Sequence, residues 1–368
     1  MACDAQPADN SAEDADLAGA EPFSDYDTGQ PMTMQPAASR TPHQRCLRWV
    51  AWSLSCAALL PLAALAQDVP SRTVTPLSAA STPRQSQDDA WWTGPMLANS
   101  AATLPRSHVL IEPYVYDVSS PHADGYGSLT YMLYGLTDRL TVGLVPVLGY
   151  NRMDGPGDSS GIGLGDVSVQ AQYRLTDVPA GSSRPTVSLQ LQETLPTGKY
   201  DRLGRRPGNG LGSGATTTTL QVNTQTYFWL SNGRILRMRF NVAQSFSARA
   251  QLEDVSVYGT PDGFRGHARP GRSFFVNAAW EYSLSQRWVL ALDVTYRRSH
   301  GARVRGDEAG GSPGLHLDGR SSEAFGFAPA IEYSWSPRLG VLFGTRVITG
   351  GHNTSTTITP AVAFNYVH

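Results

Sequence analysis

The chain has 368 residues, of which 16% are charged and 40% are hydrophobic, and its formal net charge is −2. Its 15 tyrosines, 11 phenylalanines and 8 tryptophans exclude a chain that is disordered over most of its length. The near balance of charge excludes the basic footprint of a nucleic-acid-binding protein, so no nucleic-acid partner is expected.

The first 66 residues are predicted to lie outside the fold. Residues 1–39 are acidic and rich in Ala and Pro, and we interpret them as a disordered leader or a misassigned start, because Met32 and Met34 follow closely. Residues 40–66 contain three Arg, an uncharged apolar run and a final Ala-Leu-Ala, which is typical of a cleaved signal peptide. An uncleaved membrane anchor is the alternative. Cleavage would remove all three cysteines and would place the protein beyond the inner membrane.

Residues 67–105 are rich in Ser, Thr and Pro and include the stretch DDAWWTGPMLANS. We expect a periplasmic segment here that either covers the mouth of the following domain or folds inside it as a plug. Residues 106–368 are expected to form that domain, a β-barrel. No apolar run in them is long enough for a spanning helix, which excludes a helical transporter.

A short pattern recurs along this domain: an aromatic residue, any residue, Leu or Trp, Ser or Thr, and then turn-forming residues. The copies begin at Tyr134, Tyr173, Phe228, Tyr282 and Tyr333. Each copy joins two alternating runs by about four polar residues, which is the spacing of a β-hairpin. The recurring rings are therefore expected at one level, at the short-turn end of a sheet, with Tyr366 as the last member.

The stretch YSLSQRWVLALDVTYRR, residues 282–298, shows the faces of one such strand. Alternation with period two puts Trp288, Leu292 and Tyr296 on one side and Asp293 on the other. Eight residues separate the two rings, which corresponds to roughly 20 Å along the membrane normal for a tilted strand. That height matches the apolar band of an outer-membrane barrel.

The sequence therefore predicts an all-β protein, a transmembrane antiparallel β-barrel of about twelve strands. We expect strands at 108–117, 127–135, 139–148, 163–175, 185–195, 216–230, 234–247, 272–284, 287–299, 321–335, 338–349 and 355–367. Short periplasmic turns alternate with long exposed extracellular loops at 149–162, 196–215, 248–271 and 300–320. A secreted β-sandwich is the alternative, but it does not explain the aromatic residue before each short turn.

Polar residues alternate with the apolar ones and are expected to face the lumen. The candidate pore-lining or substrate-binding residues are Gln170, Arg174, Gln190, Gln221, Arg237, Arg239, Asn241, Asn277, Glu281, Asp293, Arg297, Glu332 and Arg346. Amides occupy one side of the barrel, and arginines and carboxylates share the other. Two interpretations stay open: a water-filled pore, or a packed interior in which Arg237 and Arg239 are neutralised by Asp293 and Glu281. Glu193 breaks the pattern, because its parity places it outward unless a bulge or an early strand end intervenes.

Catalysis is not expected. A serine nucleophile needs a histidine within hydrogen-bond reach, and no Ser and His share a strand face with an acid or amide beside them. The glycine runs GIGLGD and GNGLGSG do not have the spacing of nucleotide-binding loops, so neither a cofactor nor a metal is predicted. The basic loop KYDRLGRRPGNG suits either lipopolysaccharide phosphates and anionic solutes or simple solvation.

Several motifs resemble one known family. The stretches WWTGPMLANSAATLPRSHVLIEPYVYD, YGLTDRLTVGLVP, GIGLGDVSVQAQYRL and ETLPTGKYD are similar to the outer-membrane proteins named for the meta-pathway of phenol degradation. The resemblance covers residues 91–368 and implies a bacterial outer-membrane protein that passes small hydrophobic or aromatic compounds. A pore for anionic solutes lined by arginines, or a closed barrel acting through its extracellular loops, are the alternatives.

The expected partners are outer-membrane lipid, lipopolysaccharide, a small solute and the barrel-assembly machinery. The machinery reads the C-terminal strand, which here ends on His368 rather than on the aromatic residue usual in such barrels. The sequence leaves open whether the protein is a monomer or a trimer.

Overall fold

The structure is a computed structural model that describes residues 83–368 apart from 122, 180–181 and 309–313. The predicted leader, the predicted signal peptide and residues 67–82 lie outside the described residues. Within the described part of the chain, no helix is long and apolar enough to cross a membrane.

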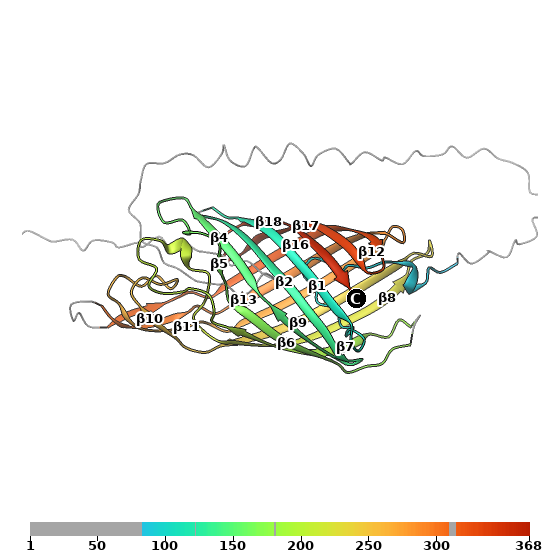
Figure 1. Cartoon of the computed structure of the whole chain (residues 1–368), viewed down its shortest axis with the longest axis horizontal. Helices are drawn as coiled ribbons and strands as arrows, with labels where there is room; N and C mark the ends of the chain where they lie inside the picture. Colours follow the sequence, from blue (N-terminus) through green and yellow to red (C-terminus); the bar gives the residue numbers. More distant parts are fainter. Residues whose placement is uncertain (1–82, 122, 180–181, 309–313) are drawn as a thin grey trace, which may run out of the picture. The chain divides into compact units, whose positions relative to one another are not determined.

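Twelve antiparallel strands form a closed barrel (Figure 1). The main sheet consists of β1 (Val109–Ser119), β2 (Ala123–Thr137), β3 (Leu140–Val145), β4 (Val147–Met153), β5 (Gly163–Leu164), β6 (Val167–Arg174), β7 (Thr186–Leu195), β8 (Thr217–Trp229), β9 (Ile235–Ser247), β12 (Ser273–Ser283), β13 (Trp288–Ser299), β16 (Ser322–Ser336), β17 (Leu339–His352) and β18 (Thr357–Val367). β3 and β4 are one wall strand interrupted at Pro146, and β5 and β6 are another. β1 pairs with both β2 and β18, so the sheet closes on itself. The predicted strand number and order are confirmed, and each strand end lies within five residues of its expected position.

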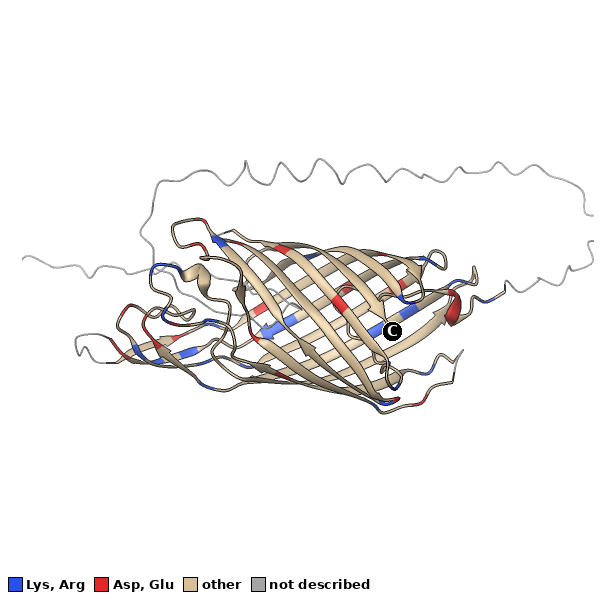
Figure 2. Cartoon of the chain, in the orientation of Figure 1, with Lys and Arg blue, Asp and Glu red and all other residues tan. Residues whose placement is uncertain are grey.

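The outer surface is the apolar face that the alternation predicted. On β13, Trp288, Leu290, Leu292 and Val294 are 40–45% exposed, whereas the intervening Val289 and Asp293 are fully buried. Aromatic pairs mark the two edges of the apolar band: the rings of Trp288 and Tyr333 are 4.6 Å apart near the short turns. Tyr296 and Phe325 lie 4.9 Å apart near the long loops. Figure 2 shows most charged residues in the connections at the two ends, with few on the strands. An apolar band between two rows of aromatic residues is the surface that outer-membrane barrels expose to lipid.

Glu193 does lie on the outer face, without a bulge. It pairs in regular register with Val169 on β6 and Thr218 on β8. The Thr218 hydroxyl donates a hydrogen bond of 2.7 Å to its carboxylate. The bulge considered from the sequence is therefore wrong. The strand does end before Pro196, at Leu195, but it includes Glu193 in regular register, so this end does not change the outward direction of the residue.

The extracellular connections are not simple exposed loops, which corrects the prediction for 248–271 and 300–320. They contain a second antiparallel sheet of β10 (Ala250–Glu253), β11 (Arg265–Arg269), β14 (Arg303–Asp307) and β15 (Leu315–Asp318). This sheet has its own core, in which Leu252, Tyr258 and Phe264 are at most 2% exposed. Figure 1 shows β10 and β11 beyond the ends of the barrel strands. The four strands have only four or five residues each, too short for their alternation to be recognised in sequence.

Candidate functional site

The lumen contains a buried charged cluster on β9 and β12. Arg237 lies directly opposite Glu281 in the register of these strands. Arg237 Nε donates to Glu281 Oε2 at 2.6 Å, and its Nη2 donates to Oε1. Arg239 Nε lies 3.2 Å from the same Oε2. All three side chains are at least 92% buried, so the carboxylate is neutralised from two sides inside the barrel. Of the two carboxylates expected to balance these arginines, Glu281 does so.

The chain before β1 lies inside the barrel. We call residues 83–106 the inner segment. Its first contact is at the β8–β9 turn, where the Gln85 amide donates to the Gly233 carbonyl at 2.9 Å. Its last is at the β2–β3 turn, where the Arg106 amide donates to Asp138 Oδ1 at 2.9 Å. Both turns are short turns, so the inner segment enters and leaves the barrel at the periplasmic end.

Two lumen carboxylates bind the main chain of the inner segment. Glu332 Oε2 accepts from the Thr93 amide and hydroxyl, both at 2.8 Å, and from the Gly94 amide at 3.2 Å. Asp293 accepts from the amides of Leu97 and Ala98 at 3.3 and 2.9 Å. Both carboxylates are buried, and each accepts hydrogen bonds from backbone amides of the inner segment that would otherwise have no acceptor in the lumen.

The arginines hold the same segment from the other side. Arg239 Nη1 donates to the Ala98 carbonyl at 2.7 Å. The guanidinium of Arg237 lies 4.4 Å from the ring centroid of Trp92, a cation–π contact. The charged groups that the sequence placed on the inner face therefore bind the inner segment as well as one another.

An amide network extends from β9 across β8, β7 and β6, beside the charged cluster. Asn241 Nδ2 donates to the Asn99 carbonyl at 3.1 Å and to Asn223 at 2.8 Å. Asn223 donates to Gln190 at 3.1 Å, and Gln190 donates to Gln170 at 3.0 Å. The network lies on β6–β9 and the charged cluster on β9, β12, β13 and β16, so amides and charges occupy neighbouring parts of the inner face.

Of the remaining candidate residues, Gln221 and Asn277 contact the groups described above, whereas Arg174 and Arg297 lie towards the two ends of the barrel. Arg174 is at the periplasmic end, 3.6 Å from Asp177. Arg297 lies towards the extracellular end, with its guanidinium 5.0 Å from the Phe275 ring centroid. Gln221 donates to Asn223 at 2.5 Å, Asn277 donates to Asp293 at 2.9 Å, and Arg346 on β17 is 3% exposed. All thirteen candidates lie on inward-parity positions, and their role toward a solute remains a prediction.

The sequence reasoning missed an apolar sector on the inner face, carried by β1, β2, β16, β17 and β18. Its buried members are Tyr114, Leu129, Ala328, Ala330, Leu342, Ala361 and Ala363, and Met96 and Leu97 of the inner segment pack against them. The signal was present, because β1 reads VLIEPYVYDV with apolar residues at both parities. On β16–β18 the inward positions include Ala328, Ala330, Leu342, Ala361 and Ala363 beside the polar ones.

The hydrogen-bond ladders of the wall lack pairs behind this sector, although the strands and their register continue. Along one row of outward positions lie Asp117 on β1, Pro360 on β18, Thr345 on β17 and Pro329 on β16. The paired positions of β1 and β18 skip Asp117 and Pro360, and those of β16 and β17 skip Pro329 and Thr345. Proline has no amide hydrogen to donate to a ladder and is rare inside a sheet. We call this row the wall gap.

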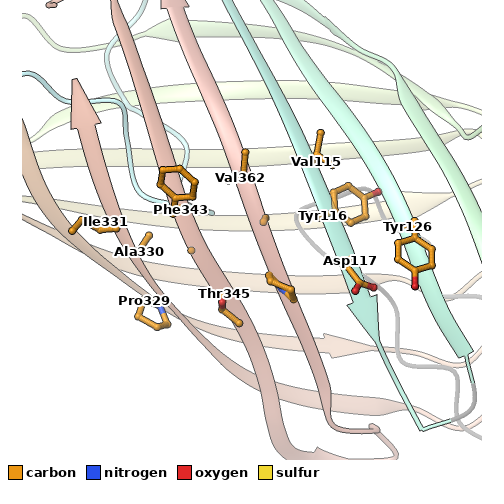
Figure 3. A pocket seen from close by; sticks show the side chains of 13 residues that line it. Val115, Tyr116, Asp117, Tyr126, Pro329, Ala330, Ile331, Phe343, Thr345 and Val362 are labelled. Atoms are coloured by element: carbon orange, nitrogen blue, oxygen red, sulfur yellow. The ribbon is translucent and has the colours of Figure 1, made fainter. Parts of the chain in front are cut away.

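A pocket of about 710 Å³ lies at the wall gap (Figure 3). Its rim consists of outward side chains, among them Val115, Ile331, Phe343 and Val362. Its floor consists of small inward residues: Ala330, Gly344 and Ala361. At Gly344, a Cβ would lie 3.0 Å from Met96 Sδ, so only the thickness of the wall separates the pocket from the inner segment. The pocket thus opens to the lipid side and backs onto the apolar sector of the lumen.

Among the described residues, no group of three or more His, Cys, Asp or Glu is arranged to hold a metal ion. The barrel combines an apolar lipid-facing pocket, an apolar inner sector, and a polar remainder of the lumen that the inner segment contacts.

Comparisons with known proteins agree with this architecture. A model of the family described as "Putative MetA-pathway of phenol degradation" matches residues 95–365. No curated protein matches the chain. The COG4313 outer membrane channel from Pseudomonas putida F1 is 15% identical, with a TM-score of 0.55 over 73% of this chain and 98% of that chain. The NanC porin is 12% identical, with a TM-score of 0.40 over 70% and 98% of the two chains. A variant of the TodX monoaromatic hydrocarbon channel is 12% identical, with a TM-score of 0.35 over 76% and 95%.

Proposed function

The chain belongs to the family described as "Putative MetA-pathway of phenol degradation" and forms an outer-membrane β-barrel, and on this premise we propose that it is a channel for passive uptake of small hydrophobic or aromatic compounds. The observation that supports the proposal most directly is the wall gap. A solute that prefers lipid to water gains nothing from a continuous aqueous pore. It gains from a route that leaves the lumen sideways into the bilayer.

The path runs along the apolar sector. A solute entering from the extracellular end meets Tyr114, Leu129 and their neighbours on one side of the lumen. The inner segment lies across the periplasmic side, where Glu332 and Asp293 hold it. The pocket at the wall gap offers about 710 Å³, which is the size range of small-molecule sites. We propose that the solute passes the wall between β1 and β18.

The alternative of an anion pore has less support. Arg237 and Arg239 share the Glu281 carboxylate and also contact the Ala98 carbonyl and the Trp92 ring of the inner segment, so both guanidinium groups are already engaged by the protein. A closed barrel acting through its extracellular side is favoured by one observation, the folded second sheet with its own core. We propose that this sheet shapes the mouth. We further propose lipopolysaccharide as partner of the exposed Arg205 and Arg206, and the assembly machinery as partner of β18.

Uptake by whole cells tests the channel. Full-length protein is produced in a Gram-negative host that lacks general porins, and the initial uptake rate of radiolabelled toluene is compared with that of cells carrying an empty vector. The proposal expects faster uptake with the protein present. Equal rates, at a verified amount of heat-modifiable barrel in the outer membrane, contradict it.

A reversible crosslink tests the route. Val115 and Val362 are registered partners on β1 and β18 beside the wall gap, and the sequence has no cysteine after Cys56. Val115→Cys with Val362→Cys is expected to lose uptake on oxidation and regain it on reduction. Ile111→Cys with Tyr366→Cys joins the same two strands near the periplasmic end and serves as the matched control. Loss of uptake in both pairs, or in neither, argues against passage at the wall gap.

A further inference from the structure

The second sheet continues four strands of the barrel without a change of register. The pair Ser273–Ser299 of β12 and β13 and the pair Arg269–Arg303 of β11 and β14 belong to one ladder, because no residue is gained or lost between them. The same holds for β9 with β10 and for β16 with β15. Side chains alternate between the two faces of a strand with period two, so Arg269 has the parity of the lumen residue Asn277. One face of the second sheet therefore extends the lumen face of the barrel.

Three arginines form one row on this face. Arg269 is paired with Arg303 in the register. Arg249 directly precedes β10, and extending the Ala250–Ala268 pair by one position places Arg249 opposite Arg269 on its other side. The three arginines are exposed, whereas Ala250 and Ala268 point to the other face and are buried in the core of the sheet. Neighbouring strands lie about 5 Å apart, so this arginine row is about 10 Å long.

Among the described residues, no carboxylate forms an ion pair with the arginine row. Other arginines of the same region do have such partners: Arg202 is paired with Glu253, and Arg305 with Asp318 at 2.6 Å. Asp318 is also the residue opposite Arg303 in the register, but Arg305 already engages its carboxylate. Like charges directly opposite one another destabilise a sheet, and a bound anion removes that repulsion.

Two kinds of molecule with several negative charges reach this side of the membrane: the phosphorylated core of lipopolysaccharide and dissolved organic anions. Lipopolysaccharide surrounds the outer side of the barrel wall. The arginine row has the parity of the lumen face instead. Arg297, six positions before Arg303 on the continuous course of β13 and β14, has the same parity and lies in the lumen. The position of the row therefore favours a dissolved anion at the extracellular mouth.

We propose that the arginine row is an anion-binding site at this mouth, and that its ligands are small organic molecules bearing two or three carboxylate groups. A planar guanidinium group binds a carboxylate through two parallel hydrogen bonds. Three such groups about 5 Å apart suit carboxylates that are carried at separate positions on one small molecule. The site adds a class of ligand to the proposed function and does not depend on the passage at the wall gap.

Binding of four compounds with the same ring tests the site. Benzamide, benzoate, isophthalate and trimesate carry zero, one, two and three negative charges at neutral pH. Equilibrium dialysis of the radiolabelled compounds against full-length protein, refolded in a non-ionic detergent at low salt, gives the Kd of each. Because dialysis measures no transport, failure of toluene uptake and failure of this site are separate results.

Two triple variants remove equal numbers of positive charges. The test variant replaces the arginine row: Arg249→Gln, Arg269→Gln and Arg303→Gln. The matched control replaces arginines that have carboxylate partners: Arg202→Gln, Arg298→Gln and Arg305→Gln. The heat-dependent gel shift verifies the barrel in each variant. Arg269→Gln alone, at the centre of the row, covers a failure of the test variant to fold.

A surface contact between a guanidinium group and a carboxylate is worth a factor of about three in affinity, so wild type should bind trimesate about 30-fold more tightly than benzamide. The test variant should reduce this ratio to about threefold or less, and Arg269→Gln alone should lower it by about threefold. The control variant should keep most of the ratio. Added salt at about 0.5 M should lower the ratio in wild type, because it screens exposed charges.

Four results overturn the inference. The ratio in wild type is close to one, or it is the same in the test variant, so that the anions bind elsewhere. The control variant loses as much as the test variant, which makes the effect one of net charge. Finally, phosphorylated lipopolysaccharide binds wild type but not the test variant while the ring acids bind neither, which makes the row a contact with lipid.

Discussion

Removing the Glu332 carboxylate is expected to loosen the inner segment and open the periplasmic side of the lumen. Glu332 holds Thr93 and Gly94 through three hydrogen bonds of 2.8, 2.8 and 3.2 Å. In Glu332→Ala these donors lose their acceptor while the barrel strands keep their own ladder. At about 1 kcal/mol for each bond, the docked state of the segment loses about 3 kcal/mol relative to the withdrawn state. That difference raises the ratio of withdrawn to docked molecules by about two orders of magnitude.

Single-channel recording in a planar bilayer measures the consequence. The refolded wild type is expected to stay closed for most of the recording, and Glu332→Ala is expected to show long-lived conductance steps. Glu323→Ala is the matched control, because Glu323 belongs to the same strand but its carboxylate lies 3.6 Å from Arg298, on the extracellular half of β16. The reasoning is refuted if a correctly folded Glu332→Ala barrel conducts as rarely as wild type. It is also refuted if Glu323→Ala opens the channel equally well.

Three further changes test other parts of the molecule. Arg237→Ala leaves the buried Glu281 with a single remaining cation. The urea concentration at which half of the folded gel band is lost should fall by the equivalent of about 3–5 kcal/mol of unfolding free energy. An unchanged midpoint would contradict the role of this pair. Pro360→Val supplies an amide hydrogen between β18 and β1 at the wall gap. Toluene uptake should therefore decrease while resistance to urea is kept or increased. Faster uptake would argue against passage there. Phe264→Ala removes the fully buried ring of the second core at a cost of about 3–5 kcal/mol. A protease added to whole cells should then cut within 250–269 or 303–318 while the barrel band persists, and equal protection would show that the second sheet does not depend on this core.

Most of the barrel was predictable because membrane strands obey local rules. Period-two alternation, an aromatic residue before each short turn and an even strand number follow from a thin apolar solvent outside and a polar interior. The inward parity of Arg237, Glu281 and Glu332 was predictable for the same reason. The pairing of Arg237 with Glu281 was also considered from the sequence. The partner of Glu332 was not predictable, since Glu332 binds Thr93 from 239 positions away and nothing local encodes that distance.

Two other features were not predicted from the sequence, for different physical reasons. The second sheet is built from strands of four or five residues, and its core depends on the long-range packing of Leu252 against Phe264 and their neighbours. The wall gap was visible in part, because Pro113, Pro329 and Pro360 interrupt predicted strands. Only the register shows that Pro329 and Pro360 stand in one row with Asp117 and that the adjoining pairs are missing.

The route of the inner segment has a topological consequence. Its first contact is at the β8–β9 turn and its last at the β2–β3 turn, and both are at the periplasmic end. The segment is therefore an inserted loop and not a thread that passes from one end of the barrel to the other. A loop of this kind can leave the lumen, or enter it after the barrel has closed, without breaking the hydrogen bonds between any two barrel strands. A force applied from the periplasm to the chain before residue 83 would therefore act in the direction that withdraws the inner segment from the lumen.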